Sequence, residues 1–181
     1  MAAGDFQKLQ KLWGHSGISK QQKLRCFDAA VVSRLVYGLA TSWLVKTQRR
    51  RVDGFYARCL RRILRIPPAF ISRVSNQYVF RIAGVLPVSV QIEKQQLKLF
   101  GQVARSCAGD PMRQDVFVGQ TLRPKIAHYI RRVGRPCLNW TEELIKLGTA
   151  RCGGYAIFER MVTNCSQEEW NGYVNRLFSR S

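Results

Sequence analysis

The sequence predicts an all-α protein, organised as a helical bundle followed by a connector and a small C-terminal helical subdomain. Apolar residues recur at helical spacing in several segments, and side chains that can cap a helix precede four of them. No convincing alternation of apolar and polar residues indicates a strand. Hydrophobic residues make up 46% of the 181 residues, which is enough for a folded core despite a large net charge.

The first two helices are predicted by their periodicity and their ends. Ser19 and Gln22 have the spacing of a capping box, which predicts a helix from about Lys20 to Tyr37. A second helix, from about Gln48 to Ile66, ends before two consecutive prolines. Both helices carry one apolar stripe, so we expect each to pack one face into a core.

Two more helices complete the predicted first domain, residues 1–107. Ser75 is expected to cap a short helix that runs through Ile82 and ends at Gly84. Pro87 then stands in a first turn, where proline is favoured, and opens a helix from about Val88 to Ser106.

The C-terminal part is predicted to be less regular. Residues 108–136 contain several glycines and prolines without a sustained period, so we expect a connector with at most short elements and a domain boundary inside it. In the third segment, residues 137–181, Asn139 is expected to cap a helix that Gly148 ends. Ser166 is expected to cap a closing amphipathic helix.

The charge predicts the class of partner. The chain has 30 Lys plus Arg against 11 Asp plus Glu, a net charge of +19, which favours RNA, DNA or a hybrid duplex. Residues 1–100 hold 18 of the basic residues and only 4 of the acidic ones, a net of +14. The basic side chains of the second helix are the first candidates for phosphate contact, although a charge run can also be a solvated face. They are Arg49, Arg50, Arg51, Arg58, Arg61, Arg62 and Arg65.

A second basic cluster lies in the connector, around Gly134-Arg135-Pro136. Arg131, Arg132 and Arg135 are candidate phosphate-binding residues, and a plain linker is an equally weighted alternative.

The sequence contains no recognisable active site. Its adjacent acids, Glu142-Glu143 and Glu168-Glu169, stand in predicted first helical turns, where carboxylates favour the helix dipole. The cysteines and histidines are too loosely spaced to indicate a zinc site, so we expect no metal and no other cofactor. No apolar run approaches the roughly 20 residues needed to span a bilayer. We therefore expect no membrane partner. We also expect an intracellular location, in the nucleus.

Several short motifs give the chain a family resemblance. The most specific is Cys-Leu-Arg-Arg-Ile-Leu at residues 59–64. The other blocks are Lys23-Leu24-Arg25, Tyr37-Gly38, Phe55, Val74-Ser75-Asn76, Leu97 with Gly101 and Val103, and Gly134-Arg135-Pro136 followed by Trp140. In the order and spacing of these blocks, over roughly residues 8–178, the chain resembles the region downstream of the palm in reverse transcriptases of non-LTR (LINE-type) retrotransposons.

The resemblance implies a thumb-like domain that grips a primer and template duplex by its backbone. It also implies that the chain is the thumb and post-thumb part of an RNA-directed DNA polymerase, whose fingers and palm would be partners and would hold the catalytic aspartates. The chain departs from the family pattern at Ala40, where many members have Glu, and at Trp43, one position later than the common Trp. Near the last Trp, Ser166-Gln167 and Asn171 replace residues that are often charged.

Two other functions fit the same sequence. The chain could be a self-standing basic helical protein that binds DNA or RNA and derives from a retroelement; an Ala- or Val-Asp-Asp palm motif encoded upstream in frame would exclude this. It could also be a protein-interaction module that docks through an exposed aromatic helix, from Trp170 to Phe178.

Overall fold

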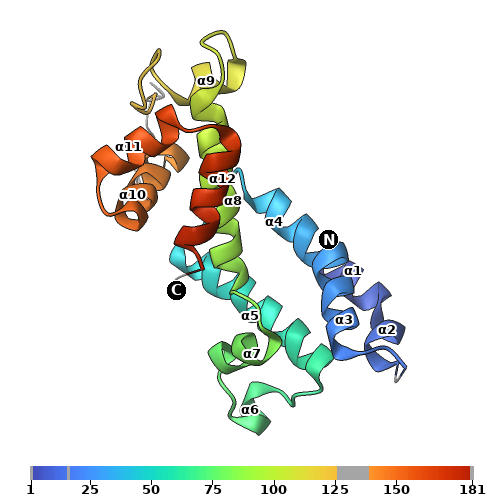
Figure 1. Cartoon of the computed structure of the whole chain (residues 1–181). Helices are drawn as coiled ribbons and strands as arrows, with labels where there is room; N and C mark the ends of the chain where they lie inside the picture. The colour runs from blue at the N-terminus through green and yellow to red at the C-terminus, as the bar shows by residue number, and fades with distance from the viewer. Residues whose placement is uncertain (1, 16, 126–138, 180–181) are drawn as a thin grey trace, which may run out of the picture. The chain divides into compact units, whose positions relative to one another are not determined.

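The computed structural model describes residues 2–15, 17–125 and 139–179, and the regular elements in these ranges are helices (Figure 1). The all-α prediction is confirmed. Strand-like pairing in the described ranges is limited to one isolated bridge, between Phe117 and Pro124. No described helix is both long and apolar enough to cross a membrane. The contacts divide the chain into two units, Met1–Ala40 with Leu44–Glu93 and Thr41–Trp43 with Lys94–Ser181, and each is described by itself.

Unit 1 contains the helices predicted for the first half of the chain and three short helices, α1, α2 and α6, that the sequence did not predict. Its elements are α1 (Ala2–Lys8), α2 (Gln10–Gly14), α3 (Lys20–Phe27), the π-helical turn η1 (Asp28–Val32), α4 (Ser33–Leu39), α5 (Lys46–Leu64), α6 (Ala69–Ser72), α7 (Asn76–Ala83) and the beginning of α8 (Val88–Arg105). The predicted helix over 20–37 is the continuous run of α3, η1 and α4. Ser19 caps it, and Gln22 completes the capping box.

Defined caps stand at the end of α5 and at both ends of α7. Arg65 ends α5 in the left-handed conformation, at φ 58°, so α5 stops before the prolines. The Ser75 hydroxyl accepts a hydrogen bond from the N–H of Tyr78 and caps α7, as predicted. Gly84, at φ 67°, ends α7 in the left-handed conformation, which glycine adopts without steric cost.

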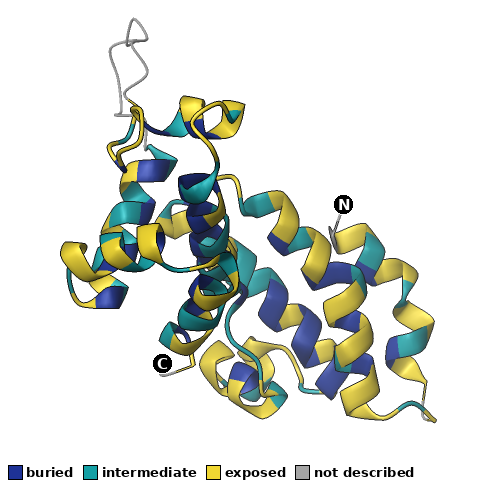
Figure 2. Ribbon diagram, turned by 45° about the horizontal axis from the view of Figure 1, so that its top comes forward, coloured by how far each residue is buried: buried dark blue, intermediate teal, exposed yellow. Residues whose placement is uncertain are grey.

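A chain of aromatic rings runs through the core of unit 1. Phe6 stacks on Trp13 with ring centroids 5.1 Å apart, and Phe27 stacks on Tyr56 at 5.6 Å. Tyr56 in turn stacks on Phe80 at 5.7 Å. These rings come from α1, α2, α3, α5 and α7, so they fix α5 within the unit. In Figure 2 the buried positions of these helices face inward and the exposed positions face outward.

Unit 2 contains the rest of α8 together with α9 (Pro111–Val116), α10 (Trp140–Cys152), α11 (Tyr155–Asn164) and α12 (Gln167–Leu177). The division falls at Glu93 and Lys94, inside α8, and not in the connector where the sequence suggested a boundary. The reason is the ring of Phe100. It lies 5.4 Å from the ring of Phe117 and 5.5 Å from that of Phe158, so the second part of α8 is core to unit 2.

The expected end of the helix at Gly148 is wrong. α10 continues through it to Cys152 and ends at Gly153, at φ 81°. Gly148 is buried because the ring of Phe158 packs directly on it, and a Cβ there would overlap that ring. Phe158 belongs to α11, which the sequence did not predict.

The expectation of an exposed aromatic face at Trp170 to Phe178 is also wrong. Trp170, Val174 and Phe178 are at most 1% exposed, because α12 packs this face inside unit 2. The indole N–H of Trp170 donates to the carbonyl of Leu97 over 2.9 Å. The predicted capping box of Ser166 and Glu169 is present at the start of the helix.

Gly101 lies against Trp170, so a larger residue at position 101 is expected to destabilise the protein. A Cβ at this position would overlap the indole ring and approach the guanidinium of Arg105. We expect Gly101→Ala to lower the free energy of unfolding by about 1–3 kcal/mol, since overpacking a core forces side chains from their positions. The matched control is Gly172→Ala in α12, where a Cβ meets no atom within 4 Å. The control should stabilise by up to about 1 kcal/mol through helix propensity. Denaturant unfolding of both variants measures the difference, and similar effects in the two would contradict the packing described here.

Candidate nucleic-acid interface

One face of α5 carries a line of exposed arginines. Arg51, Arg58 and Arg62 are separated by seven and four residues, so at 3.6 residues per turn they point within about 40° of one another. With a rise of 1.5 Å per residue they extend over about 16 Å of the helix. Arg65 continues the line at the end of the helix, and all four side chains are exposed. We call Arg51, Arg58, Arg62 and Arg65 the arginine row.

The opposite face of α5 explains why the row is held outward. Tyr56, Leu60 and Ile63 are at most 1% exposed and belong to the core of unit 1. α5 packs against α2, α3 and α7 through this face. The arginine row therefore lies on a helix whose buried face holds it in place. A ligand that binds the row does not have to order the helix, so less conformational entropy is lost on binding.

Two acidic side chains of unit 1 near α5 have partners outside the arginine row. Asp53 accepts hydrogen bonds from the N–H and the hydroxyl of Ser89, at 2.9 and 2.6 Å. Glu93 forms a salt bridge with Arg49. Asp53 also lies roughly opposite the row on the helix, since two residues from Arg51 correspond to about 200° of rotation. Neither carboxylate therefore neutralises the positive charge of the arginine row.

Arg61, which the sequence offered as a candidate for phosphate contact, is not part of the row because its side chain is buried. Its side chain is 4% exposed and its guanidinium donates to the carbonyls of Pro67 and Val74. It also donates to Ser72 Oγ and Asn76 Oδ1, each at 3.3 Å. These acceptors lie in the segment from the end of α5 to the start of α7. Arg61 therefore organises this segment and is not available to a phosphate.

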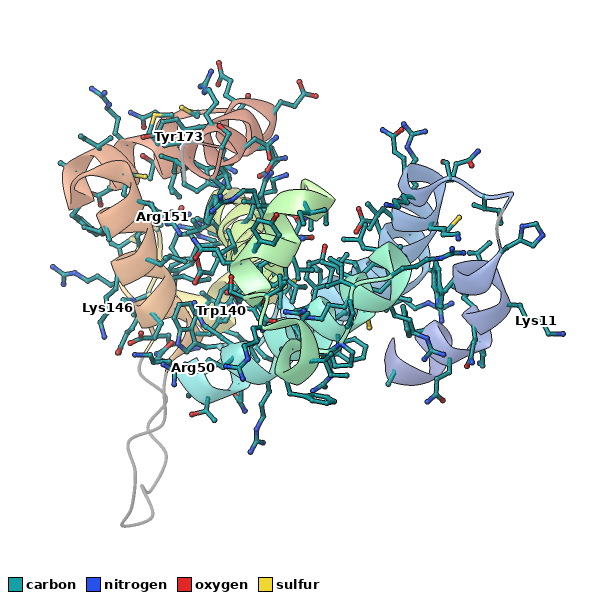
Figure 3. All side chains as sticks on the ribbon, turned by 90° about the horizontal axis from the view of Figure 1, so that it is seen from below. Lys11, Arg50, Trp140, Lys146, Arg151 and Tyr173 are labelled. Atoms are coloured by element: carbon teal, nitrogen blue, oxygen red, sulfur yellow. The ribbon has the colours of Figure 1, made fainter. Side chains whose placement is uncertain are left out.

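Arg49 and Arg50 differ from the row in other ways. Arg49 is half-buried, paired with Glu93, and its Nε donates to the carbonyl of Leu44 at 2.9 Å. Arg50 is exposed near the N-terminal end of α5 (Figure 3), but it points about 100° away from Arg51. The remaining candidates, Arg131, Arg132 and Arg135, lie outside the described residues.

Two exposed basic side chains of unit 1 are absent from the candidates that the sequence predicted, and a third basic side chain is buried. Arg73, at the end of α6, and Arg81, in α7, are exposed. The signal that could have found them is the absence of any Asp or Glu between Asp53 and Glu93. Lys23, which is in the Lys-Leu-Arg block of the resemblance, is 4% exposed and donates to the carbonyls of Trp13 and His15 at 3.0 and 2.6 Å. Its role is to hold the end of α2.

Other groups in the motifs have structural roles. Burial raises the pKa of the Cys59 thiol to about 12, although Arg58 and Arg62 oppose the shift, so the thiol is protonated at neutral pH. The acidic pairs stand in first helical turns, as predicted: Glu169 completes the cap of α12, and Glu143 pairs with Lys146 at 2.7 Å. Among the described residues no three Cys, His, Asp or Glu side chains gather where they could hold a metal ion.

Comparison of the chain with protein-family models, curated proteins and solved structures finds no match.

Proposed function

We propose that this chain binds nucleic acid by gripping the phosphate backbone of a duplex along the arginine row. The observation that carries the proposal is the row itself: four exposed guanidinium groups on one face of a helix whose other face is core. Guanidinium groups form bidentate, charge-assisted hydrogen bonds with phosphate oxygens. Such contacts position a protein on a duplex without reading its sequence.

The resemblance supports a more specific proposal. The chain would be the thumb and post-thumb part of a non-LTR retrotransposon reverse transcriptase, working with fingers and palm that carry the polymerase chemistry. The most specific motif, residues 59–64, combines the two properties that a thumb helix needs. Leu60, Ile63 and Leu64 are core, whereas Arg62 belongs to the row. An intracellular, nuclear location belongs to the same proposal.

Binding by the unmodified chain to two duplexes of unrelated sequence tests the proposed function. Four phosphate contacts should give log K against log salt a slope of about −3.6 or steeper, because each contact releases counterions. The two duplexes should bind with equal affinity at each concentration between about 50 and 200 mM salt. An affinity that is independent of salt would contradict the proposal, and so would an absence of binding at the lowest concentration.

A further inference from the structure

Large apolar side chains are exposed together on α6 and α7 of unit 1. Phe70 is 82% exposed and Ile71 63%, both in α6, and Tyr78 and Ile82 in α7 are 48% and 50% exposed. Figure 1 places α6 beside α7, at the far end of unit 1 from α4. Four exposed side chains of this kind fall within 13 consecutive residues, 70–82, on two helices that lie beside each other, and exposed apolar patches mark interaction sites.

The core of unit 1 does not use these side chains. In α7 the inward face is Val79 and Phe80, and Phe80 stacks on Tyr56 of α5. Tyr78 and Ile82 are four residues apart and therefore lie on one side of the helix, with Arg81 between them at i+3. α7 thus presents an aromatic ring, an aliphatic side chain and a guanidinium group to solvent.

Hydrogen bonds hold the patch in a defined conformation. The buried guanidinium of Arg61 reaches acceptors before, in and after α6, from Pro67 to Asn76. The hydroxyl of Ser72 donates within the same segment, 3.1 Å from the carbonyls of Pro67 and Pro68. Because the backbone that carries the rings is already ordered, a ligand that stacks on them has only the side chains left to order.

The charge around the patch selects the kind of ligand. Arg73, at the end of α6, and Arg81, in α7, are exposed within the same stretch of chain, and residues 54–92 contain no Asp or Glu. A complementary ligand therefore combines many negative charges with flat apolar faces. Single-stranded nucleic acid has both properties, whereas the bases of a duplex are stacked inside it and present only their edges.

We propose that Phe70 and Tyr78 form a stacking platform for unpaired bases of single-stranded nucleic acid, with Arg73 and Arg81 on its phosphates. The platform rests on the proposed function for the class of partner, but it uses residues outside the arginine row and acts on a different form of the nucleic acid. A module with both features holds a duplex along α5 and an adjoining unpaired strand on α6 and α7. Stacking is tolerant of sequence, because every base has a flat face.

Binding of the full chain to an unpaired oligo(dT) of about 12 nucleotides, within the site sizes of such proteins, tests the platform. Phe70→Ala and Tyr78→Ala should each weaken this binding about tenfold or more. The affinity of both variants for a blunt duplex of equal length should stay unchanged. The slope of log K against log salt for oligo(dT) should also stay unchanged, because the rings carry no charge. The matched control is Tyr37→Ala, which removes a ring that is 86% exposed in α4. Unchanged affinity for oligo(dT) in the two platform variants would overturn the proposal.

Two further substitutions at Phe70 separate stacking from general apolar docking. Phe70→Trp should keep or increase the affinity for oligo(dT), and its new indole fluorescence should be quenched by the bound bases. Phe70→Leu keeps an apolar side chain but has no aromatic face, so it should bind as weakly as Phe70→Ala. If Phe70→Leu binds as well as the unmodified chain, the patch is an apolar docking surface, as for a protein partner, and the platform is wrong.

The failure of the platform can be told apart from the failure of the proposed function. If the unmodified chain binds duplexes with a steep salt slope while the Phe70 and Tyr78 variants bind oligo(dT) normally, only the platform is refuted. If the unmodified chain binds neither form of nucleic acid, both proposals fall. Because Phe70 and Tyr78 are exposed, the variants should unfold at the same temperature as the unmodified chain, which thermal unfolding checks.

Discussion

Replacing Arg61 by Met should lower the free energy of unfolding of unit 1 by about 2–4 kcal/mol. Met keeps much of the buried volume but donates no hydrogen bond, so the carbonyls of Pro67 and Val74 and the side chains of Ser72 and Asn76 lose a charged donor. A hydrogen bond to a charged group contributes about 1.5–3 kcal/mol. Several such losses at once place this change among the largest expected for a single substitution in the chain.

The adjacent residue provides a matched control. Arg62 is the same residue type, one position along the same helix, but its side chain is exposed. Arg62→Met should change stability by no more than about 0.5 kcal/mol. Denaturant unfolding gives the two energies, and hydrogen exchange at the amides of α7 shows where the loss occurs. Equal unfolding midpoints for the two variants, with equal protection of α7, would refute the structural role of Arg61.

Local signals in the sequence predicted much of the fold. Ser19, Ser75 and Ser166 each precede a helix by one residue and cap it as expected, because a cap depends on atoms within three residues. The arginine stripe of α5 was recognised for a similar reason, since helical spacing alone separates Arg58 and Arg62 from the apolar face. The helices that the sequence missed are mostly short, or begin without a capping side chain, as α11 does after Gly154.

Tertiary contacts decided the features that the sequence could not predict. Arg61 and Arg62 are identical in type, and the difference between them arises from acceptors up to 15 residues away, after a loop whose path no local rule gives. Gly148 looks like a helix end because glycine often follows one, but here it makes room for Phe158. The exposure of Phe70 and Tyr78 could not be predicted for the same reason. Most apolar residues at helical spacing are buried, and only the tertiary structure shows which of them stay exposed to solvent.

The arginine row should determine how steeply duplex binding depends on salt. Replacing Arg51, Arg58 and Arg62 together by Ala removes three of its four cations, and each phosphate contact accounts for about 0.9 of the slope. The slope should therefore flatten by about 2.7. The loss of affinity should be the same for duplexes of unrelated sequence, because backbone contacts do not read bases. Far-ultraviolet circular dichroism should stay unchanged, since the three side chains are exposed.

A second triple variant separates the position of the charges from their number. Arg123, Arg160 and Arg176 are exposed in unit 2, and replacing them by Ala lowers the formal net charge by the same three units, from +19 to +16. If binding depended on net charge alone, the two triple variants would behave alike. If it depends on the arginine row, the unit 2 variant should keep the slope of the unmodified chain.

The most direct measurement is therefore the slope of log K against log salt for a blunt duplex, recorded from about 50 to 200 mM for the unmodified chain and both triple variants. The slope should be flatter by about 2.7 for the Arg51, Arg58 and Arg62 variant and should be unaltered for the unit 2 variant. An unaltered slope for the first variant, with the protein folded, would mean that the row is a solvated helix face and not an interface.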